Sequence, residues 1–199
     1  LYYSAIFPFQ RYATNFLEVT LQIPAAEAAD LFRWFPILAM VLTPFLGGFL
    51  DTKGKGASML MLGAIIMIVC HLSFAFLLPV FPNKWFALLL VVVLGVSFSL
   101  VPAALWPSVP KIIPEKNLGT AYSLIYWVQN LGMWAVPIYV GRIFTKEITE
   151  AGNHAQEVSA AIHAEWIFIL LGVVAIAVAL LLFFSSKKHP ELRLDEPAQ

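Results

Sequence analysis

GGFLDTKGKG, residues 47–56, is a short polar break in an otherwise apolar part of the chain. Long stretches without acidic or basic residues lie on both sides of it. Three interpretations of the break are open: a loop that cradles a phosphate group, a plain turn, and a hinge that works in a conformational change. The choice between them depends on what the flanking stretches are.

The composition indicates an integral membrane protein. Apolar residues make up 60% of the 199 positions, charged residues make up 12%, and the mean hydropathy is +0.82. A typical soluble domain has about a quarter charged residues, and it could not bury this much apolar surface. The formal net charge is zero, so nothing suggests a nucleic-acid partner.

Two further expectations follow from the single cysteine and from the first residue. Cys70 lies inside an apolar stretch, so no disulfide framework is expected. The sequence starts at Leu1 without a methionine or a basic segment, which argues against a signal peptide. We therefore expect a fragment of a longer protein.

Six stretches have the roughly twenty apolar residues that a helix needs to cross a bilayer. The stretches are continuous and do not alternate, which favours helices over the strands of a barrel. The predicted spans cover approximately residues 1–20, 31–50, 57–78, 85–106, 118–144 and 166–185. The predicted fold class is an all-α membrane protein.

Proline clusters and charged segments predict the connections between the spans. The clusters at residues 79–83 and 107–114 are expected to break the chain. Residues 145–165 carry four glutamates and are predicted as the longest loop, with room for a short surface helix. The predicted domain division is therefore a six-helix unit, residues 1–186, and a polar cytoplasmic tail, residues 187–199.

Lysine and arginine predict the orientation, because they favour the cytoplasmic side of a membrane. With six spans, the segment 47–56 shares a side with both ends of the chain. That side has more basic residues than the other: Lys53, Lys55, Lys111, Lys116, Lys187, Lys188 and Arg193, against Arg33, Lys84, Arg142 and Lys146. We expect a multi-pass protein of the cell (inner) membrane with both ends in the cytoplasm.

Arg11, in FPFQRYATNF, is the clear exception to the absence of charge from the spans. A buried arginine costs about 2.5–3.5 kcal/mol on insertion scales, and such residues usually face a cavity or a partner. Asn15 lies four positions further on and shares its helix face. Either an anionic ligand or a part of the protein outside this sequence neutralises Arg11, or the side chain reaches out of the membrane to an interface.

The fifth span carries polar side chains at helical spacing, with Tyr122, Tyr126, Gln129 and Met133 on one stripe and Asn130 beside it. Amide groups are costly in hydrocarbon unless they are hydrogen-bonded. The stripe is interpreted either as hydrogen bonding between helices or as one wall of a polar path through the membrane.

Motifs of catalysis are missing from the sequence. It has no HExxH, no GxSxG, no Walker loop and no paired intramembrane aspartates, so no enzyme is predicted. His71 has no second ligand at metal spacing and is interpreted as a hydrogen-bonded packing residue. No metal or cofactor is expected. GGFLDTKGKG lacks the GxxxxGK[ST] spacing, which excludes the phosphate cradle.

Two segments resemble signatures of the major facilitator superfamily. Its loop signature, G-x-x-x-D-[RK]-x-G-[RK]-[RK], joins the second and third helices of each six-helix half. The chain resembles it at Gly47 (or Gly48), Asp51, Lys53, Gly54 and Lys55, with Thr52 in place of the first basic residue, as in degenerate C-terminal copies. PEKNLGTAYSL, residues 114–124, resembles the superfamily's P-E-x-x-x-G-x-A-x-G segment, although Leu118 stands where many members have arginine. Residues 104–132 and 7–16 look like the lysosomal dipeptide-uniporter branch.

The resemblance implies a fold and a missing partner. The superfamily has twelve helices in two halves, each built from two inverted three-helix repeats. This chain would be the C-terminal half, and the N-terminal six-helix half would be its partner in the lipid bilayer. The substrate would lie midway through the membrane, between the halves, lined mainly by the first and fourth helix of each half.

The resulting hypothesis is a transporter of small solutes, possibly dipeptides or other small anionic organic solutes, that works by rocker-switch alternating access. Arg11 would bind the anionic group. Tyr12, Asn15, Gln129 and Asn130 would supply polar contacts, Phe9, Phe32 and Trp106 apolar walls, and Tyr126 part of the stripe. Pro102 and Pro107 would permit the bending that closes the inner gate. The alternative is a signalling or assembly subunit that keeps the carrier fold without transport.

Ion coupling stays open. A proton-coupled carrier normally needs a titratable group in the membrane, and this half offers only His71, with Glu18 near one edge. Either the coupling acid lies in the N-terminal half, or the protein is a facilitator. The resemblance also gives segment 47–56 a role. Asp51 closes a helix at its negative end, which is locally unfavourable. In the family, this acid contacts the start of a neighbouring helix and latches the outward-open state. We expect Asp51 to contact the start of the fifth helix, near Gly119 and Thr120.

Overall fold

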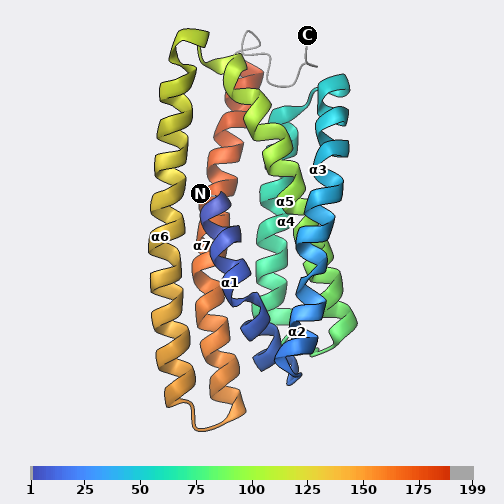
Figure 1. Ribbon diagram of the computed structural model, residues 1–199, viewed down its shortest axis with the longest axis vertical. Coiled ribbons are helices and arrows are strands. Elements are labelled where there is room, and N and C mark those ends of the chain that lie inside the picture. The colour runs from blue at the N-terminus through green and yellow to red at the C-terminus, as the bar shows by residue number, and fades with distance from the viewer. Residues whose placement is uncertain (1, 189–199) are drawn as a thin grey trace.

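The computed structural model describes residues 2–188, which form helices that run side by side in one bundle (Figure 1). The helices are α1 (Tyr2–Leu21), α2 (Ala25–Phe32), α3 (Trp34–Lys53), α4 (Gly56–Leu72), α5 (Lys84–Ile112), α6 (Leu118–Glu150) and α7 (His154–Lys188). A π-helical turn, η1 (Ser73–Leu77), continues α4, and a 3-10 turn, η2 (Glu115–Asn117), precedes α6.

Four segments are long and apolar enough to cross a membrane: residues 25–53, 56–77, 84–112 and 154–188. The other two predicted spans correspond to α1 and α6, which pack against α7 and against each other. The helical fold class is therefore confirmed over the described residues. The arrangement of six spans as two inverted repeats stays a prediction.

The fourth span is longer than predicted. α5 runs through three prolines to Ile112 and ends before Pro114, so the expected break at residue 107 is wrong. A membrane helix tolerates proline where another donor bonds the carbonyl that proline leaves free. Pro110 frees the carbonyl of Trp106 in this way, and the hydroxyl of Tyr122 donates to that oxygen at 3.4 Å.

The predicted break at residues 79–83 is confirmed. Asn83 is the N-cap of α5, and its side-chain oxygen accepts from the backbone N–H groups of Trp85 and Phe86 at 2.8 and 3.2 Å. Such a cap contributes about 1 kcal/mol to helix stability.

The predicted long loop at residues 145–165 is wrong. α6 continues to Glu150 and α7 begins at His154, so three residues connect the two helices. The glutamates that suggested a loop are good helix formers, and they mark helical turns at the end of the bundle. Glu165 therefore lies within α7. The predicted tail lies outside the described residues from residue 189 on, while Lys187 and Lys188 belong to α7.

The two ends of the bundle are named after some of the side chains that they carry. At one end lie Lys53, Lys55, Lys111, Lys116 and Lys187, and we call it the lysine end. At the opposite end α6 turns into α7 and α4 into α5, and we call it the histidine end after His71, His154 and His163. α1 starts about halfway along the bundle and runs to the histidine end (Figure 1).

A buried polar chain joins α1, α5 and α4 near the middle of the bundle. The hydroxyl of Tyr2 lies 2.7 Å from that of Ser97, which donates to the backbone oxygen of Gly63 at 2.8 Å. A Cβ atom on Gly63 would lie 2.9 Å from a methyl group of Val101, closer than real contacts allow. The glycine therefore sets how closely α4 approaches α5.

We expect Gly63→Ala to lower the free energy of unfolding by about 1–3 kcal/mol, because the added methyl group overpacks the contact between α4 and α5. The measurement is thermal unfolding of the purified protein in detergent. Gly47→Ala is the matched control, since nothing lies within 4 Å of a Cβ atom there. Equal melting temperatures for the two variants would contradict the prediction.

Candidate substrate-binding face

α1 presents two different faces to its surroundings. Phe9 and Arg11 are two positions apart, which places them about 200° apart around the helix. Phe9 is 1% exposed, whereas Arg11 is exposed. One face of α1 is therefore part of the protein core, and the other is open to a ligand or to another part of the protein.

Arg11 lies about halfway along α1 and lines a hollow of about 320 Å³ between α1 and α6. The other lining residues are Phe7, Pro8, Gln10, Met133 and Pro137. Within residues 2–188, Arg11 forms no ion pair. A cation in an apolar hollow without a counter-ion is a site where an anionic group would be stabilised.

Tyr12 and Asn15 flank Arg11 but have different surroundings. The hydroxyl of Tyr12 donates to the backbone oxygen of Pro137 at 2.8 Å, which ties α1 to α6. Asn15 is exposed, one helical turn beyond Arg11. Of these two predicted contacts, Asn15 is the one whose side chain is available to a ligand.

An aromatic stripe leads along α1 to Arg11. The rings of Tyr3 and Phe7 are stacked with centroids 5.5 Å apart, and Arg11 follows Phe7 by four positions. Trp106 of α5 donates its indole N–H to the hydroxyl oxygen of Tyr3 at 3.3 Å and stacks on Tyr126 of α6 at 5.2 Å. The structure thus brings the predicted residues Trp106 and Tyr126 together, joined to Arg11 through Tyr3 and Phe7.

The sequence interpretation missed Tyr3 and Phe7. Their signal was present, because residues 3, 7 and 11 recur at four-residue spacing and share one helix face. Once Arg11 was selected, the same stripe pointed to both aromatic residues.

The amide side chains of α6 form bonds within their own helix. The Gln129 amide donates to the sulfur of Met133 at 3.6 Å, and the Asn130 amide donates to the backbone oxygen of Tyr126 at 2.8 Å. The oxygen of Gln129 is buried and has no hydrogen-bond partner among the described residues. Asn130 is exposed beside Tyr126. The interpretation as hydrogen bonding between helices is not borne out for these two bonds.

Phe9, predicted as an apolar wall of the site, is not accessible in this structure. Phe9 packs against Phe32, Phe74 and Phe168 with ring centroids 5.4–6.1 Å apart. The cluster is enclosed by α1, α2, η1 and α7, so the prediction for Phe9 is corrected to a core residue. Phe32 is half-buried and stacks on Phe35 at the start of α3.

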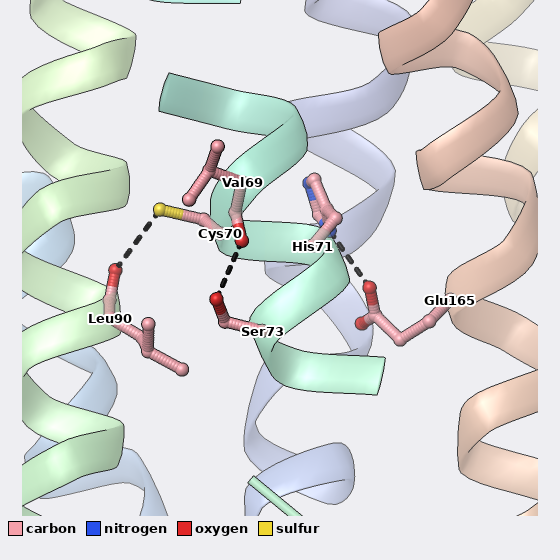
Figure 2. A network of polar contacts seen from close by, with 6 residues as sticks. All are labelled: Val69, Cys70, His71, Ser73, Leu90 and Glu165. Atoms are coloured by element: carbon pink, nitrogen blue, oxygen red, sulfur yellow. Dashed lines mark hydrogen bonds and ion pairs between the residues drawn. The ribbon is translucent and has the colours of Figure 1, made fainter. Parts of the chain in front are cut away.

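His71 and Glu165 form a buried pair that the sequence interpretation did not find. The Nδ1 atom of His71 and an Oε atom of Glu165 are 2.8 Å apart, and the two side chains are 0% and 2% exposed (Figure 2). Glu165 was assigned to the loop before the sixth predicted span, whereas it lies within α7. His71 is hydrogen-bonded, as expected, but its partner is ionisable.

The structure places the residues of segment 47–56 at the turn between α3 and α4. Gly54 and Lys55 have positive φ angles of 70° and 68°, which let the chain reverse direction within two residues. Gly47 and Lys53 belong to α3, and no atoms lie within 4 Å of a Cβ built on Gly47. The interpretation of segment 47–56 as a turn is therefore confirmed at Gly54 and Lys55.

Asp51 lies in the last turn of α3 and is exposed. It lines a small cavity of about 80 Å³ with residues of the end of α5, among them Pro107, Ser108 and Lys111. Among the described residues no hydrogen bond joins Asp51 to the start of α6, so the expected contact near residues 119–120 is not made in this conformation. The role of segment 47–56 as a latch stays a prediction.

A larger cavity, about 460 Å³, lies beyond the start of α1 toward the lysine end. α4, α5, α6 and α7 all contribute to its walls, which are apolar apart from Tyr2, Tyr3 and Gln129. It offers no charged side chain to a solute. The hollow at Arg11 is therefore the better candidate for binding an anion.

Comparison with known proteins places the chain in a family. The profile described as Major Facilitator Superfamily matches residues 3–199. The chain belongs to the Major Facilitator Superfamily. Members of this superfamily are membrane transporters, not enzymes, which agrees with the absence of catalytic motifs.

Curated relatives of the chain within the superfamily include lysosomal dipeptide transporter MFSD1 of several vertebrates. The identity over 142 residues is 36% for the protein of Danio rerio, 34% for that of Gallus gallus and 32% for that of Homo sapiens. The matched region covers 71% of this chain. It spans 31% of the length of the Gallus gallus protein and 29% of the human one. The predicted resemblance to the superfamily and to this branch is confirmed.

We expect Phe9→Ala to lower the free energy of unfolding by about 3–5 kcal/mol, because it removes a ring from the centre of a fully packed cluster. Phe45→Ala is the control, since Phe45 is 73% exposed on α3. Thermal unfolding in detergent distinguishes the two. If Phe9→Ala changed the affinity for a solute while the melting temperature stayed unchanged, Phe9 would be a binding-site wall after all.

Proposed function

We propose that this chain is one six-helix half of a transporter that carries small anionic organic solutes, dipeptides among them, across a membrane. The proposal rests on the position of Arg11. It is a cation halfway along α1 that lines a hollow and has no acidic partner in the described part of the chain.

The position of Arg11 in the middle of a membrane helix is energetically costly. Insertion scales assign an arginine at the centre of a membrane helix a cost of about 2.5–3.5 kcal/mol. An anionic group bound to the guanidinium would offset this cost, and the planar fork of arginine matches both oxygens of a carboxylate. A free peptide carboxylate has that shape and charge, and the curated relatives are named as dipeptide transporters.

The rest of the face supplies contacts of a different kind. Phe7 lines the hollow beside Arg11, and Tyr3, Trp106 and Tyr126 continue its aromatic surface along the face, which would hold an apolar side chain of the solute. Asn15 and Asn130 are exposed amides that could bind its peptide group. Arg11 would therefore fix the orientation, and the aromatic stripe would tolerate variation in side chain.

Alternating access would complete the cycle. A second six-helix half would pack over the face that carries Arg11, and the two halves would rock around the bound solute. The prolines of α5 at positions 102 and 107 would let its lysine-end turns bend, while segment 47–56 would latch one of the two states. Both ends of the chain would lie in the cytoplasm. The relatives carry the word lysosomal in their names, so the expected cell (inner) membrane has no support from them.

We expect Arg11→Ala to raise the KM for dipeptide uptake into liposomes roughly 10- to 150-fold, the equivalent of losing a charged hydrogen bond of about 1.5–3 kcal/mol. Arg11→Lys should be intermediate, because an ammonium group keeps the charge but not the two-point geometry. Uptake of a labelled dipeptide at varied concentration is the measurement.

Arg33→Ala is the matched control, because Arg33 is exposed and pairs with Asp30 of α2 at 2.9 Å. Its KM should equal that of the wild type. Unchanged uptake by a properly folded Arg11→Ala protein would remove Arg11 from the site. If the wild type took up no solute and gained no thermal stability from dipeptides or organic anions, the alternative of a non-transporting subunit would be favoured.

A further inference from the structure

His71 and Glu165 are joined across the interface between α4 and α7, behind α1. Their side chains are 0% and 2% exposed, and the ring of Phe168 stacks on His71 at 5.3 Å. Phe9 of α1 meets the same imidazole edge to face at 4.9 Å. The pair is therefore enclosed by aromatic rings and sealed from the face that carries Arg11.

The charge of this pair depends on one proton. A neutral His71 with an ionised Glu165 would leave one uncompensated negative charge in the core, at a cost of several kcal/mol. A single added proton, on either residue, makes the pair neutral overall and keeps a hydrogen bond across the 2.8 Å separation. The enclosed pair is thus electrically neutral only in the state that holds the extra proton.

The nitrogen Nε2 of His71 supplies a second, independent observation. It is buried and has no hydrogen-bond partner among the described residues. Where Nδ1 carries the hydrogen of the bond to Glu165, Nε2 is the unprotonated nitrogen of the imidazole, so it has a free lone pair for one proton.

The backbone at this point is also irregular. The π-helical turn η1 begins at Ser73, two residues after His71. Such turns inside α-helices occur often at functional sites and change the register of the helix. Ser73 donates its hydroxyl to the backbone oxygen of Val69 at 2.7 Å, which bonds the helix on the side opposite the pair (Figure 2).

Other ionisable groups on the surrounding elements face away from the pair. The thiol of Cys70 is directed at the backbone oxygen of Leu90 in α5 (Figure 2). On the packed helices the remaining groups have other partners or surroundings: Arg11 in the hollow, Tyr12 with Pro137, Tyr2 with Ser97, His163 with Glu147, His154 with Glu157, Lys84 with Glu27, and Glu18, half-buried more than two turns beyond Phe9.

We propose that His71 and Glu165 form a proton-binding site of the transporter, and that occupancy of this site is linked to the position of α1 and hence to solute binding at Arg11. The link runs through Phe9, which touches the imidazole on one face of α1 while Arg11 lies on the other. One proton from water enters when the histidine end opens, and it neutralises the pair when that end closes. This inference deepens the proposed transport function, and its transport test rests on that function.

The first experiment measures proton binding without transport. Infrared difference spectra of the whole protein in detergent, recorded against pH, should contain a carboxyl signal that is lost in Glu165→Gln and shifted in pH by His71→Gln. Glu147→Gln is the matched control, because Glu147 lies the same 2.8 Å from His163 but the pair is exposed. A spectrum unchanged by Glu165→Gln would overturn the proposal.

The second experiment measures linkage in liposomes. One linked proton changes the apparent solute affinity by up to about tenfold per pH unit, so the wild type should have a KM that varies with pH on the histidine side. Glu165→Gln should flatten this profile while solute exchange at equal pH continues. A wild-type pH profile retained by Glu165→Gln would overturn the link.

A double variant controls for misfolding of the single variants. Removing one member of a buried pair is destabilising, whereas replacing both by apolar residues is often tolerated. His71→Leu combined with Glu165→Leu should therefore fold and exchange solute, with a flat pH profile. If this protein kept the wild-type profile, the proposal would fail. A wild type that transported none of the tested solutes would instead count against the proposed function, and the infrared arm would still decide proton binding.

Discussion

The packing of Phe9 is the interaction on which the candidate site depends. This ring fixes α1 against η1 and α7, and it touches the imidazole of the buried pair. Because a helix is rigid over a few turns, seating Phe9 also determines where Arg11 points on the opposite face. The aromatic stripe of Tyr3 and Phe7 follows from the same orientation. A displacement of α1 would change the core contact and the ligand face together.

The part of the fold that sequence could predict is the part that the bilayer dictates. Apolar length alone located the centres of the helices, and Asn83 marked the start of α5 through its capping side chain. The positions of the ends were less predictable. Proline normally ends a helix in water, but in α5 the Tyr122 hydroxyl bonds the carbonyl that Pro110 leaves free. That donor comes from another helix, so no local pattern in the sequence could reveal it.

The candidate site also has a part that the sequence could predict and a part that it could not. Arg11 was predictable because a charge in an apolar span is conspicuous, and Trp106 and Tyr126 lie beside the same stripe. Glu165 was not predictable by this reasoning, since it stands in a polar segment that resembles a loop. Only the three-dimensional packing of α4 against α7 shows that it faces His71. The hydropathy pattern along the sequence thus reveals an isolated charge in an apolar span. It cannot reveal a pair whose members lie 94 positions apart.

The short connection between α6 and α7 has a mechanical consequence. At about 1.5 Å per residue, the 33 and 35 residues of these helices give lengths near 50 Å, whereas the hydrocarbon core of a bilayer is about 30 Å thick. Their joined turns, tied by His163 and Glu147, extend past the apolar segments as a helical hairpin. Such a hairpin is a stiff projection beyond the apolar part of the bundle. An antibody fragment bound to it would give images of single particles a rigid landmark for alignment.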